Sequence, residues 1–177
     1  MKKVCIILIG LSILTAVAIL AILFVGKGNQ TAYLRLHIRA NSNAAVDQEI
    51  KYQIKEEVTE FLTPIVANCP TKDDSMQAMQ NALPELEAFI NDFLKANGFG
   101  YKAKAALRVE EFPTRVYEGV TLPAGVYDAL IIELGSGTGD NWWCVLYPPL
   151  CFSGGYTGAN VQYRVKIWEI LQNFFAN

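Results

Sequence analysis

The spacing of apolar and polar side chains predicts a first strand close to residue 33. Residues 33–40 alternate between apolar and polar side chains, which is typical of a strand with one buried face and one wet face. The polar positions of this alternation are Tyr33, Arg35, His37 and Arg39. The asparagine and serine side chains of residues 41–43, which follow, can cap a helix.

From Ala44 the apolar positions recur every three or four residues, and this spacing predicts a helix that ends just before Pro70. A second helical stretch follows Pro70 and stops at Asn97, where a glycine comes next. Pro84 lies inside the apolar stripe of this stretch, so we expect either a kink or two abutting helices there. The apolar spacing from Asn160 onward predicts a last amphipathic helix.

Alternating patterns return after residue 100 and predict further strands over residues 101–110, 116–120 and 126–134. Pro and Gly within residues 122–125 predict a turn between the last two strands, which we expect to pair as an antiparallel hairpin. Strands and helices in this order predict an α+β fold, in which two to three helices pack on one face of an antiparallel sheet.

A long uncharged stretch precedes this domain. Val4–Gly26 contains 23 residues without a charge, about 35 Å as a helix and therefore enough to cross a ~30 Å hydrocarbon core. Lys2 and Lys3 predict that the N-terminus stays in the cytoplasm and that the rest is exported. A membrane anchor and a cleaved signal peptide both fit, and we favour the anchor because the apolar region is longer than in most signal peptides and Gly26-Lys27-Gly28 matches a small-x-small cleavage site poorly. We divide the chain into an anchor or signal segment, residues 1–27, and an exported domain, residues 28–177.

Charge and cysteine content limit the classes of partner, covalent link and metal site that the exported domain can have. It carries 12 Lys and Arg residues against 17 Asp and Glu residues, a net charge of −5, which argues against nucleic acid as a partner. Three of the four cysteines lie in this domain, so a disulfide formed in an oxidising compartment leaves one of them unpaired. No clustered His and Cys spacing indicates a metal site, and we expect no cofactor.

The segment from Gly135 to Phe152 concentrates glycine, tryptophan, cysteine and proline. Its G-S-G-T-G start is similar to a phosphate-binding turn, but a strand pattern follows instead of the helix that such a site needs, so we interpret it as a hairpin turn. In a strand, Trp142 and Trp143 point to opposite faces, and whichever is exposed is a candidate binding anchor, with core packing as the alternative. We predict a partner-binding surface here, formed by Asp140, Asn141, Trp142, Trp143, Tyr147, Pro148 and Pro149.

Two hypotheses concern Cys144. As a thiol nucleophile it would need His37, the only histidine, as its base. Two arginines on the same strand face disfavour the imidazolium that must form, and no cysteine-protease signature surrounds the thiol, so we assign no catalytic residue. As a disulfide it would pair with Cys151, because the two prolines between them can turn the chain back. A straight strand would hold the two Cα atoms about 20 Å apart, whereas a bond needs them within roughly 7 Å.

Three stretches together resemble the stage II sporulation protein R family of endospore-forming bacteria. They are L-R-L-H-I-R-A-N-S at residues 34–42, P-A-G-V-Y at residues 123–127, and the glycine-tryptophan-cysteine-proline segment at residues 135–151. The resemblance covers residues 33–152 and is most specific in its second half.

This resemblance implies a signalling role. Proteins of the family are made in the forespore and exported toward the space between the forespore and the mother cell. There they trigger a membrane-embedded protease of the mother cell, which processes the precursor of sigma factor E. The resemblance implies no enzyme activity and no active site that could be transferred. A secreted thiol-dependent envelope enzyme that uses Cys144 is the competing hypothesis.

Overall fold

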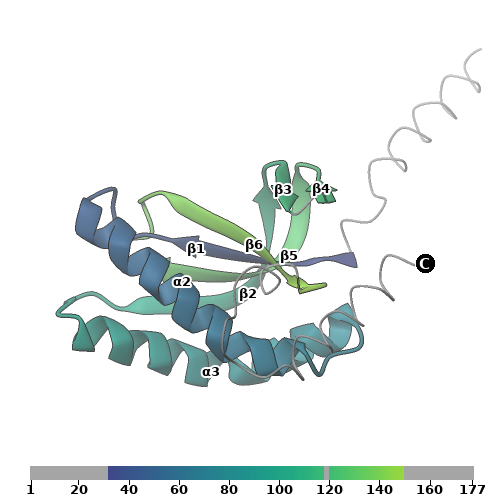
Figure 1. Ribbon diagram of the computed structural model, residues 1–177, viewed down its shortest axis with the longest axis horizontal. Helices are drawn as coiled ribbons and strands as arrows, with labels where there is room; N and C mark the ends of the chain where they lie inside the picture. The colour runs from purple at the N-terminus through teal and green to yellow at the C-terminus, as the bar shows by residue number, and fades with distance from the viewer. Residues whose placement is uncertain (1–31, 118–119, 150–177) are drawn as a thin grey trace, which may run out of the picture. The chain divides into compact units, whose positions relative to one another are not determined.

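The computed structural model describes residues 32–117 and 120–149 of the chain. These residues form a four-stranded sheet, two helices and a two-stranded ribbon (Figure 1). The predicted membrane or signal segment and the helix predicted from Asn160 lie outside the described residues. Within the described part, neither helix combines the length and the apolar character that crossing a membrane requires.

The sheet has the strand order β2-β5-β1-β6 and is mixed. Strand β1 (Leu34–Arg39) lies between β5 (Gly125–Leu134), to which it is parallel, and β6 (Asn141–Tyr147), to which it is antiparallel. Strand β2 (Ala103–Phe112) pairs antiparallel with β5. The α+β class is therefore confirmed. The expected antiparallel pairing holds for β2 with β5 and for β1 with β6, whereas the pairing of β1 with β5 is parallel, so the sheet is mixed. A parallel pair needs a long crossover, and both helices lie in the chain between β1 and β5.

Helices α2 (Ala45–Val66) and α3 (Lys72–Ala96) contact each other and lie on the same side of the sheet (Figure 1). Thr71 caps α3 by accepting a hydrogen bond from the amide of Asp74. Pro84 lies inside α3 without dividing it, so the expected pair of abutting helices does not form. Pro84 is on the exposed side, where water can bond the carbonyl group that the proline leaves unpaired.

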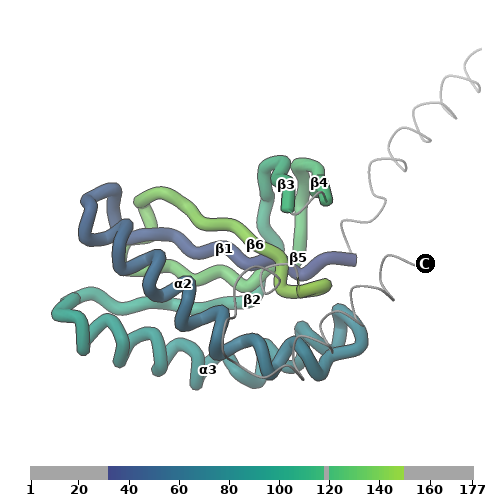
Figure 2. Tube along the Cα trace, viewed as in Figure 1, coloured from purple at the N-terminus to yellow at the C-terminus, as the bar shows by residue number. Residues whose placement is uncertain are grey.

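The strands that follow α3 do not pair as we expected from the turn at residues 122–125. Strand β5 pairs with β2, and the short strands β3 (Arg115–Tyr117) and β4 (Val120–Leu122) pair with each other beyond the end of β2 and β5. The predicted pairing of residues 116–120 with residues 126–134 is thus wrong. Prolines at 113 and 123 interrupt both strands at the same level, because proline cannot donate to a ladder. The β3–β4 ribbon therefore leaves the plane of the sheet (Figure 2).

Both faces of β1 are buried, which corrects the prediction of a strand with one wet face. Leu34, Leu36 and Ile38 face the helices and are 0% exposed. On the opposite face, which we call the second face, Arg35 and His37 are 0% and 1% exposed. Side chains of β2, β6 and the β3–β4 ribbon cover this face, so the polar half of the alternation lies inside the protein.

Candidate functional site

Arg35 is the most buried charged residue of the second face. Its Nε donates to the backbone oxygen of Cys144 (3.2 Å) and its Nη2 donates to the hydroxyl of Tyr117 (2.9 Å). The guanidinium carbon lies 4.4 Å from the ring centre of Phe112 and 4.8 Å from that of Tyr127. Its Nη1 has no hydrogen-bond partner, and no ion pair to Arg35 occurs in the described part of the chain. Aromatic rings and neutral oxygens therefore surround this cation, an arrangement that stabilises a desolvated guanidinium.

His37 follows on the same face and bonds a carboxylate. Its Nδ1 lies 2.8 Å from Oε1 of Glu110, and its ring stacks on Trp143 with ring centres 3.6 Å apart. The Nε2 atom has no hydrogen-bond partner. Burial lowers the pKa of His37; the carboxylate of Glu110 opposes this shift and the charge of Arg39 adds to it. The ring is therefore neutral at pH 7, and Nδ1–H donates to Glu110.

A charged network forms the rim of the second face. Arg39 donates to Glu133 (2.7 Å) and to Glu110 (2.5 Å), and Arg108 donates to Glu133 (2.8 Å). Burial raises the pKa of Glu110, but the hydrogen bond from His37 and the charge of Arg39 outweigh burial, so the net shift is downward. The hydrogen bond from Arg108 lowers the pKa of Glu133. Both carboxylates are ionised at pH 7, which matches them to the two arginines.

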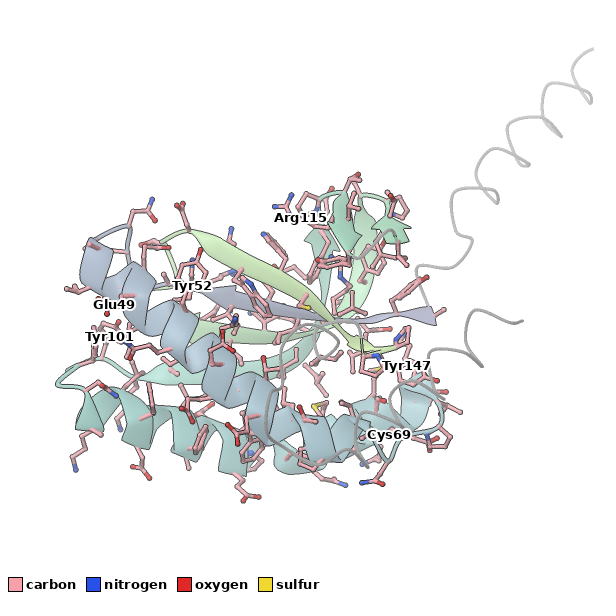
Figure 3. All side chains as sticks on the ribbon, in the orientation of Figure 1. Glu49, Tyr52, Cys69, Tyr101, Arg115 and Tyr147 are labelled. Atoms are coloured by element: carbon pink, nitrogen blue, oxygen red, sulfur yellow. The ribbon has the colours of Figure 1, made fainter. Side chains whose placement is uncertain are left out.

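The β3–β4 ribbon supplies the cover of this face. Tyr117 is tied to Arg35, and the guanidinium carbon of Arg115 lies 5.8 Å from the ring centre of Trp143. Figure 3 shows Arg115 on the ribbon, on the side of the sheet away from the helices. The ribbon is therefore held to the sheet by two arginine–aromatic contacts, one in each direction.

The two tryptophans lie on opposite faces of β6, as the strand pattern predicts. Trp143 is paired with His37 on the second face, whereas Trp142 is paired with Ile38 on the helix side. There Nζ of Lys55 lies 5.7 Å from the ring centre of Trp142. Both tryptophans are half-buried, so each combines packing with an accessible edge.

The predicted partner-binding residues do not gather on one surface. Asp140 and Asn141 are exposed. Tyr147 and the two prolines after it are buried, and the Tyr147 hydroxyl donates to the backbone oxygen of Pro70 (2.7 Å). Figure 3 shows Tyr147 beside Cys69, at the opposite end of the domain from Tyr101. The exposed part of the predicted surface is thus the start of β6, and its contact with a partner stays a prediction.

The glycine-rich segment before β6 packs against the loop between β1 and α2. The amide of Gly139 donates to the backbone oxygen of Ala40 (2.9 Å), and a Cβ atom at this position would lie 2.3 Å from the backbone oxygen of Ser42. Gly137 has a φ of 63°, a conformation that favours glycine. These glycines permit a close backbone approach in a turn between β5 and β6, which a strand follows as expected. The two strands are not neighbours in the sheet, because β1 lies between them, so the interpretation of this turn as a hairpin is wrong.

The polar partners of the second face are far from it in sequence, and sequence reasoning missed them. Glu110 is 73 residues from His37, and Tyr117 is 82 residues from Arg35. Elsewhere in the domain, the buried carboxylate of Asp47 accepts from Ser42 (2.6 Å), which is close in sequence, and from Tyr101 (2.7 Å), which is 54 residues away. The apolar alternation of residues 101–110 was the only local signal that strand β2 would be near.

The structure separates the proposed thiol pair. Cys144 is 5% exposed and disulfide-bonded, and it lies beside Leu36 on the helix side of β6, whereas His37 is on the second face. Cys69 is a buried free cysteine. Cys151 lies outside the described residues, so its pairing with Cys144 stays a prediction. No group of three or more His, Cys, Asp or Glu side chains suited to a metal occurs within residues 32–117 and 120–149.

The family model and the curated relative that match this chain point to the same protein family. The model of the family "Stage II sporulation protein R" matches residues 30–156, which include every described helix and strand. The chain is 35% identical over 129 residues to the protein of that name from Bacillus subtilis (strain 168). The match covers 73% of this chain and 58% of the relative, less than two thirds of the relative's length. Among solved structures there is no match.

Proposed function

The chain belongs to the stage II sporulation protein R family, and we propose on that basis that it is a signalling protein of sporulation. In this proposal it is made in the forespore and exported, anchored or secreted, into the space between the two membranes. There it activates the membrane-embedded protease of the mother cell that processes the sigma factor E precursor. The observation that carries the proposal is the family match over residues 30–156.

Features of the chain support export as part of this role. The uncharged Val4–Gly26 stretch follows two lysines, as in segments that enter a membrane with the N-terminus inside. The disulfide at Cys144 suits an oxidising compartment outside the cytoplasm. The net negative charge of residues 28–177 is compatible with a protein partner rather than nucleic acid.

The competing hypothesis, a secreted thiol enzyme, has no geometric support. A nucleophilic cysteine must be a thiolate within reach of its base. The sulfur of Cys144 is bonded and buried, and His37 is on the opposite face of the sheet, bonded to Glu110. We therefore retain the signalling function as the conclusion.

The test of the function is removal of the gene from its sporulating host. We expect the sigma factor precursor to stay uncleaved in the mother cell, and cleavage to return when the full-length chain is supplied in the forespore. The time course of cleavage is followed by immunoblotting of the precursor. Normal cleavage without the gene would contradict the proposal, as would restoration by a chain that is kept in the cytoplasm.

We further propose that the start of β6 contacts the protease. Trp142 and Trp143 offer large apolar area on β6, which has no neighbouring strand on its outer side among residues 32–117 and 120–149. Because each is half-buried, truncation to alanine should cost less than the ~3–5 kcal/mol typical of a core tryptophan. A variant of one of them should therefore fold and fail to signal.

Single alanine substitutions at Trp142 and Trp143, with Tyr52→Ala as the control, test this contact. Tyr52 is 51% exposed on α2 and belongs to no predicted surface. Thermal unfolding and exported amount are measured beside precursor cleavage for each variant. If every variant that loses signalling also loses its fold, the tryptophans are structural and the contact lies elsewhere.

A further inference from the structure

Strand β2 forms one edge of the sheet, and side chains of α3 close only half of that edge. The Asn91 side chain bonds both the amide (2.7 Å) and the carbonyl oxygen (3.4 Å) of Ala103, and the Glu87 carboxylate accepts from the amide of Ala105 (3.0 Å). These bonds show that the odd-numbered residues of β2 direct their backbone groups away from β5.

The other half of the same edge is open. Strand β2 pairs with β5 without a register shift, so Leu107, Val109 and Glu111 also direct their amides and carbonyls outward. Within the described residues, no hydrogen bond closes these outward groups. An unpaired edge of this kind is a template for another strand, and proteins usually block it with charge, proline or a covering element.

A groove runs beside the open half, between β2 and the N-terminal half of α3. It has a volume of about 450 Å³, and Met76, Leu107 and Val109 supply its apolar lining. Val109 is 62% exposed, so its side chain is accessible to an incoming chain. Asp73 lies in the lining and Glu111 at the end of the open half, and both are exposed. The other two charged residues of the lining are already paired, Asp128 with Lys72 and Arg108 with Glu110 and Glu133. The groove side of the edge thus combines an apolar centre with negative charge.

We propose that the open half of β2 and this groove, together the β2 edge site, bind an extended segment of another polypeptide as a fifth strand. The outward backbone groups select an extended chain, and alternate side chains of that chain enter the groove. Val109 and Met76 select an apolar residue, and the nearby carboxylates select Lys or Arg. A second copy of this chain is the less suitable occupant, because it would present the same acidic side chains.

A peptide library tests the β2 edge site with the full-length chain purified in detergent. The probes are fluorescent heptapeptides with Val, Leu, Ile, Phe or Lys at the second, fourth and sixth positions and Thr at the others. We expect members that combine apolar residues with Lys to bind. Val109→Pro should weaken the binding of these peptides about tenfold or more. The substitution removes an outward amide, and the proline ring obstructs the incoming strand. The ladder to β5 does not use this amide, so the melting temperature should change little.

A charge-reversed pair of variants provides the matched control. Glu111→Lys should weaken Lys-bearing peptides and leave all-apolar peptides unchanged, whereas Glu85→Lys, at an exposed carboxylate of α3 outside the groove, should change neither. Absence of binding by every peptide would overturn the proposal, as would equal binding by Val109→Pro in a folded state or equal effects of the two charge reversals. Light scattering that shows a dimer broken by Val109→Pro would assign the edge to a second copy instead.

Discussion

Replacing Arg35 by Met and by Lys separates the two energies that act on this buried cation. Met removes the charge and both hydrogen bonds but keeps most of the side-chain volume. Lys keeps the charge but loses the planar fork that reaches the Cys144 oxygen and the Tyr117 hydroxyl at the same time. Since Arg35 is 0% exposed and forms no ion pair within the described residues, the charge itself is costly to bury.

The magnitudes of these two energies predict that Arg35→Lys is less stable than Arg35→Met. Two hydrogen bonds from a charged donor contribute about 1.5–3 kcal/mol each, while burying an ion costs several kcal/mol. Arg35→Met loses the two hydrogen bonds, but it also removes the cost of burying an ion. Its free energy of unfolding should therefore change by no more than about 2 kcal/mol. Arg35→Lys loses the bonds and the ring stacking and still buries an ammonium group, so it should lose about 3 kcal/mol or more.

Urea unfolding of the full-length chain measures both values. Met and Lys substitutions of Arg115 are the control, because Arg115 is exposed and both should cost less than about 1 kcal/mol. Cleavage by a protease at the β3–β4 ribbon adds a second readout, since both Arg35 variants release Tyr117. If Arg35→Lys is as stable as Arg35→Met, or more stable, the guanidinium is not held as an uncompensated buried cation.

Three further outcomes follow from other parts of the domain. Burial lowers the pKa of His37 from its ordinary 6.5, so stability should be full above about pH 6.5 and fall as the pH drops toward the folded-state pKa; His37→Gln should remove this slope in urea titrations. Gly139→Ala places a methyl group 2.3 Å from a backbone oxygen and should lower the melting temperature strongly, whereas Gly100→Ala meets open space and should not. Non-reducing peptide mapping should recover Cys144 linked to Cys151; recovery of both as free thiols would exclude the pair.

Local periodicity predicted the elements well because helices and strands obey short-range rules. The observed α2 and α3 lie within the stretches predicted on either side of Pro70. Alternation also placed Trp142 and Trp143 on opposite faces, since successive side chains of a strand must alternate. Pro84 does not divide α3, because it lies on the side of the helix that meets water, and which side that is depends on the packed domain.

The alternation in β1 could not show that its polar half is buried. Arg35 is inside only because Phe112, Tyr117 and Tyr127 come together over it, and these residues belong to strands that lie far along the chain. The same holds for the parallel pairing of β1 with β5, which two intervening helices make geometrically available. Pairing between distant segments decides such features, and the two-residue periodicity of a single strand contains no information about that pairing.

Reconstitution in growing cells tests most directly whether this chain triggers the protease. Non-sporulating cells would produce the membrane-embedded sporulation protease and the sigma factor precursor, with or without the full-length chain bearing its own N-terminal segment. Cleaved precursor is then quantified by immunoblotting. We expect cleavage only when the chain is present and exported. Cleavage of equal extent without it, or none in its presence while an authentic activator restores cleavage in the same cells, would contradict the proposed function.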